Sequence, residues 1–311
     1  MSSFQIFEPA YTFIDGKLDT FLNADAANVI AQVAGPMRAA LVLYVLLYGF
    51  AILRGAISEP IMDFAVRSLK LAFIFMLATT VAYSSWITTP LFQTLPSALT
   101  QALGGSASTD PGTAFDQFFA RAAYLGEKIS QTASLTNPAP YLVAAGVYAV
   151  GAVAAALGFG IVIVAKVALA LIIALGPIFV ACSLFDASRR FFFGWLSQAV
   201  NYVLLMALII TVLQMILSLV GDQWGQINGQ DPVVGGLIFI ALSILGTIFF
   251  LQTPAIAAGI AGGASAGLAD FGNAAGVAFR GPRFTNLPQG GRTQVPRPSS
   301  GGSLRPVGAR A

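Results

Sequence analysis

Charge and histidine are scarce in this chain of 311 residues. Only 9% of the residues are charged, whereas soluble domains carry about a quarter, so most of the surface must face lipid or other chains. Histidine, the commonest general base and metal ligand, is absent. One cysteine, Cys182, excludes an internal disulfide and is too little for a soft-metal site. This composition argues against a soluble enzyme, a secreted disulfide domain and a nucleic-acid reader with a basic face, and we predict neither a cofactor nor a metal.

Motifs for phosphate binding and acid–base chemistry are missing as well. The sequence contains no GxxxxGK run followed by Ser or Thr. Its carboxylates are scattered, with no pair at helical spacing inside an apolar segment. These absences argue against an enzyme. Repeated halves and intramembrane acids are also missing, which argues against an ion-coupled transporter.

Long apolar segments are what the chain has instead, since 57% of its residues are hydrophobic. A bilayer core of about 30 Å needs about 20 apolar residues of helix, and an open sheet edge cannot lie in lipid. The predicted fold is therefore all-α, a polytopic integral membrane protein with about five transmembrane helices plus amphipathic periplasmic helices. The apolar blocks are 35–53, 69–87, 142–185, 196–220 and 233–251.

Composition divides the chain into five predicted segments. Residues 1–34 form an amphipathic periplasmic N-terminal segment with no basic signal-peptide start, and residues 35–90 hold the first two transmembrane helices. Residues 91–140 form a periplasmic central loop with a helix. Residues 141–258 hold a long helix rich in small residues and the remaining transmembrane helices. Residues 259–311 form a disordered cytoplasmic tail rich in Gly, Pro and Arg.

The two amphipathic segments are candidate contact surfaces. Apolar residues recur every three or four positions in the N-terminal segment, which predicts a helix. That helix either lies on the membrane or a neighbouring subunit, or folds back on the transmembrane helices. In the central loop, one side of a second predicted helix offers a periplasmic docking surface made of Phe115, Phe118 and Phe119.

The third apolar block, 142–185, is long enough to cross the membrane twice. If it crosses once and the N-terminus is outside, most Lys and Arg residues are cytoplasmic, as the positive-inside bias requires. Two crossings with the N-terminus inside satisfy the bias as well. We favour five crossings, with the N-terminus and central loop in the periplasm and the C-terminus in the cytoplasm.

Three features of the third block are candidate functional positions. Lys166 is its only deep charge, and it either snorkels to the interface or faces a subunit interface or lumen. Gly176 and Pro177 predict a helix break, which is either a fixed kink or a hinge. Small residues at a spacing of four allow close helix packing or line a pore. They are Gly151, Ala155, Ala154 and Gly158.

Two stretches of the sequence resemble a known family. The first is LRGAISEP at 53–60, with Lys70 opening the next helix. The second runs from Lys166 through LGPIF at 175–179 and FDASRRF at 185–191 to Trp195. This order resembles the TrbL/VirB-six family, the polytopic inner-membrane subunit of bacterial type IV secretion systems, over about residues 1–258. The matching positions are Arg54, Gly55, Glu59, Pro60 and Lys70 in the first stretch and Lys166, Gly176, Pro177, Arg189, Arg190 and Trp195 in the second.

The resemblance implies a location, partners and a function. The matching residues would have structural or gating roles, and the protein would lie in the inner membrane with the central loop in the periplasm. Several copies would assemble beneath the pilus or stalk and contact minor-pilin and scaffold subunits, while separate ATPase subunits supply energy. The assembly would help DNA or protein substrates across the membrane. Two alternatives stay open, a stand-alone channel or carrier for a small solute and a structural platform with no transit path.

Overall fold

The computed structural model describes residues 5–55, 61–80, 82–103, 110–134, 137–185, 187–227 and 232–278. Every regular element in these ranges is a helix, which confirms the all-α prediction. In chain order they are α1 Phe7–Leu53, α2 Ile61–Thr79, the π-helical turns η1 Ser84–Thr88 and η2 Pro90–Thr94, α3 Leu95–Ala102, α4 Pro111–Ser130, α5 Ala139–Ala174, α6 Gly176–Cys182, α7 Arg189–Ile227 and α8 Pro232–Ala278.

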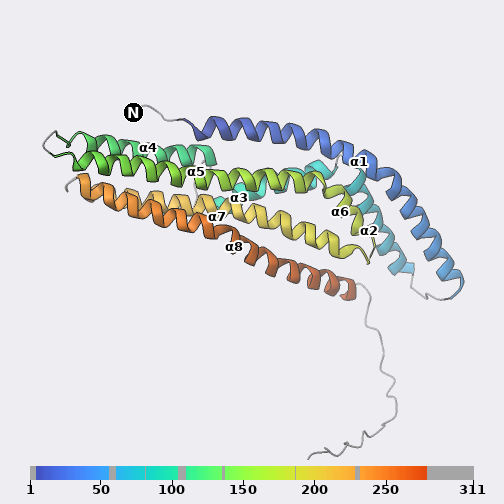
Figure 1. The fold of residues 1–311 in the computed structure, drawn as a ribbon. Helices are drawn as coiled ribbons and strands as arrows, with labels where there is room; N and C mark the ends of the chain where they lie inside the picture. The colour runs from blue at the N-terminus through green and yellow to red at the C-terminus, as the bar shows by residue number, and fades with distance from the viewer. Residues whose placement is uncertain are drawn as a thin grey trace, which may run out of the picture.

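Helix α5 occupies the centre of the bundle. It packs against α4, α7, α8 and the N-terminal half of α1, and these long helices lie alongside one another (Figure 1). Buried residues recur every three or four positions along α5. This period places side chains on one side of a helix, so one whole face of α5 is buried. The buried residues include Val147, Ala155, Val162, Leu169 and Ile173.

The number of long apolar helices agrees with about five crossings. Within the described residues, α1, α5, α7 and α8 are each long and apolar enough to span a bilayer. A fifth candidate span consists of two helical pieces, Ala65–Thr79 and Ser84–Ala102, bent by 89° relative to each other. The second apolar block was expected as one straight segment, and the structure corrects this because its helix ends at Thr79 and the chain then turns.

The third apolar block provides one crossing. A second crossing would require the chain to reverse direction, and α5 runs without a break over 36 residues. The helix stops only at Ala174, where the short helix α6 begins with Gly176 and Pro177. One unbroken candidate span in this block favours one crossing over two.

Helices continue across two of the predicted segment boundaries. Helix α1 joins the amphipathic N-terminal segment to the first apolar block with no break at residue 34, and Pro36 lies inside it. Its N-terminal half folds back on α4 and α5, one of the two alternatives considered for this segment. Helix α8 continues to Ala278, so residues 259–278 are helical and not disordered. The rest of the predicted tail, 279–311, lies outside the described residues.

Candidate functional site

Lys166 lies inside the fold and is held by α1. Its ammonium group is 2.5 Å from a carboxylate oxygen of Asp15 and donates a hydrogen bond of 2.6 Å to the hydroxyl of Tyr11. It also lies 4.2 Å from the centre of the Tyr11 ring and 5.1 Å from that of Phe92 in η2. Lys166 is only 5% exposed, so snorkelling is excluded in this structure. Its partner, Asp15, comes from the N-terminal half of α1 and lies outside the apolar blocks.

A second carboxylate holds the first turn of the same helix. Asp116 of α4 is buried and accepts hydrogen bonds of 2.9 Å from the backbone N–H groups of Ile6, Phe7 and Glu8. The first N–H groups of a helix have no partner within the helix, and negative charge is favourable at that end. Asp116 therefore satisfies three donors at once and fixes the start of α1 on α4.

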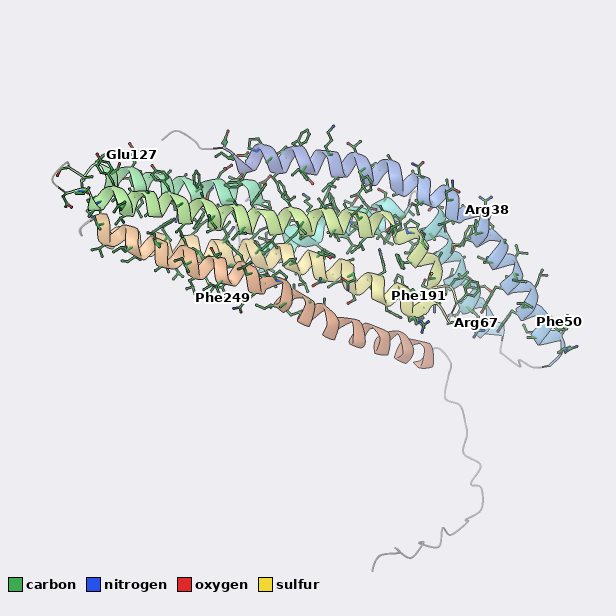
Figure 2. The ribbon with its side chains drawn as sticks, in the orientation of Figure 1. Arg38, Phe50, Arg67, Glu127, Phe191 and Phe249 are labelled. Carbon is green, nitrogen blue, oxygen red and sulfur yellow. The ribbon has the colours of Figure 1, made fainter. Side chains whose placement is uncertain are left out.

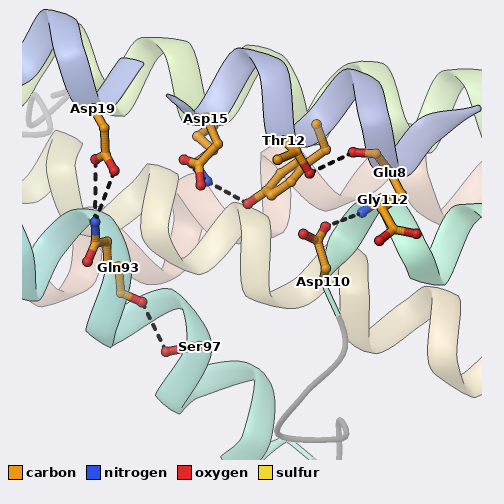
Figure 3. Close-up of polar contacts among 10 residues, drawn as sticks. Glu8, Thr12, Asp15, Asp19, Gln93, Ser97, Asp110 and Gly112 are labelled. Carbon is orange, nitrogen blue, oxygen red and sulfur yellow. Dashed lines mark hydrogen bonds and ion pairs between the residues drawn. The ribbon is translucent and has the colours of Figure 1, made fainter. Parts of the chain in front are cut away.

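Helix α4 begins next to the first turn of α1. The carboxylate of Asp110 accepts a hydrogen bond of 2.7 Å from the N–H of Gly112 and so caps α4 (Figure 3). A Cβ at Gly112 would lie 2.5 Å from the Cα of Glu8, so only glycine permits this close approach of α1 and α4. Burial raises the pKa of the Asp110 carboxyl, although the bond from Gly112 and the charge of Lys166 act in the opposite direction.

These contacts form what we call the α1 clasp, defined as Tyr11, Asp15, Asp116 and Lys166. The clasp joins α1 to α4 and α5 through charge-assisted hydrogen bonds, which are stronger than neutral ones. A neighbouring carboxylate on the same face of α1, Asp19, is much less engaged: Gln93 donates to it at 3.4 Å (Figure 3). The clasp holds the N-terminal half of α1 against α4 and α5.

The helix break at Gly176 and Pro177 is enclosed by two aromatic donors. The hydroxyl of Tyr83 donates to the carbonyl oxygen of Ile173 at 2.6 Å, and the indole N–H of Trp195 donates to that of Ile172 at 2.8 Å. Trp195 also stacks on Phe179 of α6. Sequence reasoning had selected Gly176, Pro177 and Trp195 and missed Tyr83, which carries no distinguishing local pattern.

The small residues of α5 pack within this chain. Ala154 and Ala155 are buried, a Cβ at Gly151 would lie 2.7 Å from the Cβ of Ala122 in α4, and one at Gly158 would lie 2.6 Å from the ring of Phe115. In the described fold this face packs against α4 and α8, and pore lining stays a prediction.

The residues of the predicted docking surface on α4 lie mostly inside the fold. Phe115 and Phe118 are 0% and 1% exposed. Phe115 packs edge-on against Phe159 and Phe250, and Phe118 stacks on Phe239. Phe119 is partly buried. The apolar side of α4 therefore faces the core of the same chain, because α5 and α8 offer apolar partners that the isolated segment could not reveal.

The remaining matching positions lie mostly at one end of the molecule. Gly55 has a φ of +68°, a conformation suited to glycine after a helix end, and Arg54 stacks over Phe50 at 4.7 Å. Figure 2 shows Phe50, Arg67 and Phe191 toward the same end, with Glu127 at the opposite one. Arg190 stacks over Phe191, Arg189 over Phe193, and Lys70 lies on α2 near Arg67. Glu59 and Pro60 lie outside the described residues.

No group of three or more Cys, Asp or Glu residues in the described ranges is placed to hold a metal ion. The described elements thus define a class, an all-helical polytopic membrane protein with a partly buried ion pair between its first helix and its central helix.

Comparison with known proteins then identifies the family. The model of the TrbL/VirB6 plasmid conjugal transfer protein family matches residues 41–253, and the chain belongs to this family. Two relatives are the type IV secretion system proteins VirB6 of Bartonella quintana (strain Toulouse) and Bartonella henselae (strain ATCC 49882 / DSM 28221 / CCUG 30454 / Houston 1). Each is 25% identical, and each alignment covers 94% of this chain and 88% of the relative. The chain is a multi-pass inner-membrane component of a type IV secretion system, and other secretion subunits are its partners.

Proposed function

We propose that several copies of this chain form a platform in the inner membrane that helps DNA or protein substrates across and supports assembly of the pilus or stalk. In this platform the N-terminus, α4 and the α4–α5 loop face the periplasm, and the C-terminus faces the cytoplasm. The stalk or minor-pilin subunits and the scaffold contact the periplasmic side, and separate ATPase subunits act from the cytoplasm.

The observation that carries this orientation is the basic end of the molecule, defined as Arg54, Arg67, Lys70, Arg189 and Arg190. These residues come from three separate parts of the sequence, and the fold gathers them at one end of the long axis. Loops rich in Lys and Arg stay on the cytoplasmic side of a membrane. The basic end is therefore cytoplasmic, and the opposite end, marked by Glu127 in Figure 2, is periplasmic.

Cysteine labelling of intact cells tests this orientation. Single cysteines replace Gln131, at the end of α4, Ala187, in the α6–α7 turn, and Gly290, in the C-terminal tail, in a Cys182→Ser background. We expect a membrane-impermeant maleimide to label Gln131→Cys alone until the cells are permeabilised. Labelling of Ala187→Cys with Gln131→Cys protected would reverse the molecule and contradict the proposal.

The apolar surface of α1 supports assembly into several copies. Val42, Leu46 and Leu53 are 57%, 65% and 87% exposed, so this half of α1 has few partners within the chain and lipid or a second copy must cover it. We expect Leu46→Cys, in the Cys182→Ser background, to form disulfide-linked dimers on mild oxidation in membranes. A strictly monomeric product at Leu46, Val42 and Leu53 alike would argue against contact between copies through α1.

Substrate passage is tested by a mating or secretion assay with the same variants. The small-residue face of α5 is filled by α4 and α8, so the path we propose runs between copies and not through one copy. Crosslinks from a transported substrate should appear at surface positions of α1 and remain absent at Ala155, which is buried. No contact in the described ranges favours a stand-alone solute channel, the alternative considered from the sequence.

A further inference from the structure

Two helix breaks that are far apart in the sequence meet inside the fold. One is the bend after α2, where the two helical pieces are bent by 89° relative to each other. In this bend the N–H of Tyr83 donates a hydrogen bond of 3.1 Å to the carbonyl of Thr80. The other is the break between α5 and α6 at Gly176 and Pro177. Tyr83 has no exposed surface, and its hydroxyl lies between the two. We call this arrangement the double bend.

The carbonyl that accepts from Tyr83 lacks the donor that an uninterrupted α-helix would give it. In an uninterrupted α-helix the N–H of residue 177 would donate to the carbonyl of residue 173. Pro177 has no N–H, so the carbonyl of Ile173 loses this bond; the N–H of Leu175 also points toward it but makes its hydrogen bond of 3.2 Å to the carbonyl of Leu171. A buried unpaired carbonyl is costly. The Tyr83 hydroxyl replaces the missing donor at 2.6 Å.

Gly176 provides the space for this hydroxyl. A Cβ at position 176 would overlap the Tyr83 hydroxyl oxygen and would lie 2.9 Å from the Trp195 ring. The glycine and the proline therefore have separate tasks, since Pro177 removes the helical donor and Gly176 admits the donor from another element. This pairing requires both breaks to keep their present geometry together.

We propose that the Tyr83 hydroxyl couples the two breaks, so that the bend after α2 and the α5–α6 break open and close as one unit. Tyr83 is a positioning residue, because its effect on the rest of the molecule passes through the Ile173 carbonyl. The α5–α6 break leads through α6 to the turn before Arg189, and the chain that follows the bend after α2 carries Phe92, which lies beside Lys166. The double bend thus connects the basic end with the α1 clasp, and this inference does not depend on the proposed function.

Hydrogen–deuterium exchange of the purified full-length protein in detergent tests the coupling. Tyr83→Phe removes only the hydroxyl and leaves the ring in place. We expect the amide exchange rate to rise about fivefold or more both in peptides spanning 171–180 and in peptides spanning 76–83. A rise of this size corresponds to the loss of one hydrogen bond to a buried carbonyl. Acceleration restricted to 171–180 would make the hydroxyl a local cap and overturn the coupling, and no acceleration in either region would overturn the whole inference.

Tyr148→Phe is the matched control. The Tyr148 hydroxyl also donates to a backbone carbonyl, that of Ala123 at 3.0 Å, but on the unbroken helix α4. We expect this variant to leave exchange at both breaks unchanged. Equal melting temperatures for the two variants and the parent would show that the exchange reports local opening and not global unfolding.

A second background separates the proposed contact from any general effect of Tyr83. Pro177→Ala restores an N–H that can donate to Ile173, so the hydroxyl becomes dispensable. In that background Tyr83→Phe should change exchange in 171–180 by about twofold or less. A fivefold rise that persists without Pro177 would show that the hydroxyl acts elsewhere, which would refute the proposal.

Discussion

The ion pair of the α1 clasp can be broken from one side by Asp15→Asn. This change leaves the Lys166 ammonium inside the fold with the Tyr11 hydroxyl as its remaining partner in the clasp. Removing one partner from a fully buried pair costs about 3–5 kcal/mol, and an exposed pair contributes about 1 kcal/mol or less. The two side chains are 7% and 37% exposed, so we expect an intermediate value of about 2 kcal/mol, which is roughly a 30-fold rise in the undocked population of α1.

The assay is the reaction rate of a cysteine that is protected only while α1 is docked. Ala26 of α1 is 6% exposed and small enough to be replaced by cysteine without crowding. In a Cys182→Ser background, Ala26→Cys should react with maleimide roughly 30-fold faster when Asp15→Asn is added, in line with the loss of about 2 kcal/mol.

Two comparison variants make the reasoning refutable. Asp19→Asn changes an adjacent carboxylate whose bonds from Gln93 are 3.4 Å long, and it should change the rate by about twofold or less because such long bonds are weak. Lys166→Met replaces the charge with an apolar side chain of similar length, so adding it to Asp15→Asn should restore most of the protection. If Asp15→Asn and Asp19→Asn gave the same rate, the ion pair would not hold α1 in place.

Three further predictions concern the surroundings of the clasp and the core. Asp116→Ala should leave three N–H groups of α1 unpaired and make the N-terminus sensitive to protease, with about 2 kcal/mol lost, whereas unchanged digestion would contradict the role of Asp116. Gly158→Ala should lower the melting temperature because its Cβ would lie 2.6 Å from the ring of Phe115, while Gly160→Ala, with no atom within 4 Å, should not; equal melting of the two would count against this packing. Burial raises the pKa of Asp110, so the stability that its protonated form contributes is present at acid pH and is lost as the pH rises through the folded-state pKa. Asp110→Asn should therefore weaken the fall in melting temperature as the pH rises above the ordinary carboxyl pKa of about 4, and an unaltered profile would exclude Asp110 as its source.

The sequence predicted the membrane character and the approximate number of spans because these depend on composition over windows of about 20 residues. It also located the break at Gly176 and Pro177, since a proline cannot continue the hydrogen-bond ladder of a helix whatever surrounds it. The fold and the family match confirm both the helical class and the family that the two stretches resembled.

Partners from distant parts of the chain could not be predicted. Asp15 and Lys166 are separated by 151 positions, whereas a periodicity argument compares residues only a few positions apart. Their contact exists only because α1 folds back on α5. Phe115 and Phe118 were assigned to a docking surface because an amphipathic helix shows which of its faces is apolar and not what covers that face. Tyr83 escaped notice for the same reason, since its role follows from a carbonyl in another helix.

The uninterrupted run of α1 from Phe7 to Leu53 has a mechanical consequence (Figure 1). Tyr48 near its C-terminus is buried and contacts Arg67 of α2, while the clasp and its surroundings hold the helix from Tyr11 to Asp19. The stretch from there to Leu53 is about 50 Å long at the rise of an α-helix. One continuous helix therefore joins the clasp to the contacts that α1 makes with α2 and α6 toward the basic end.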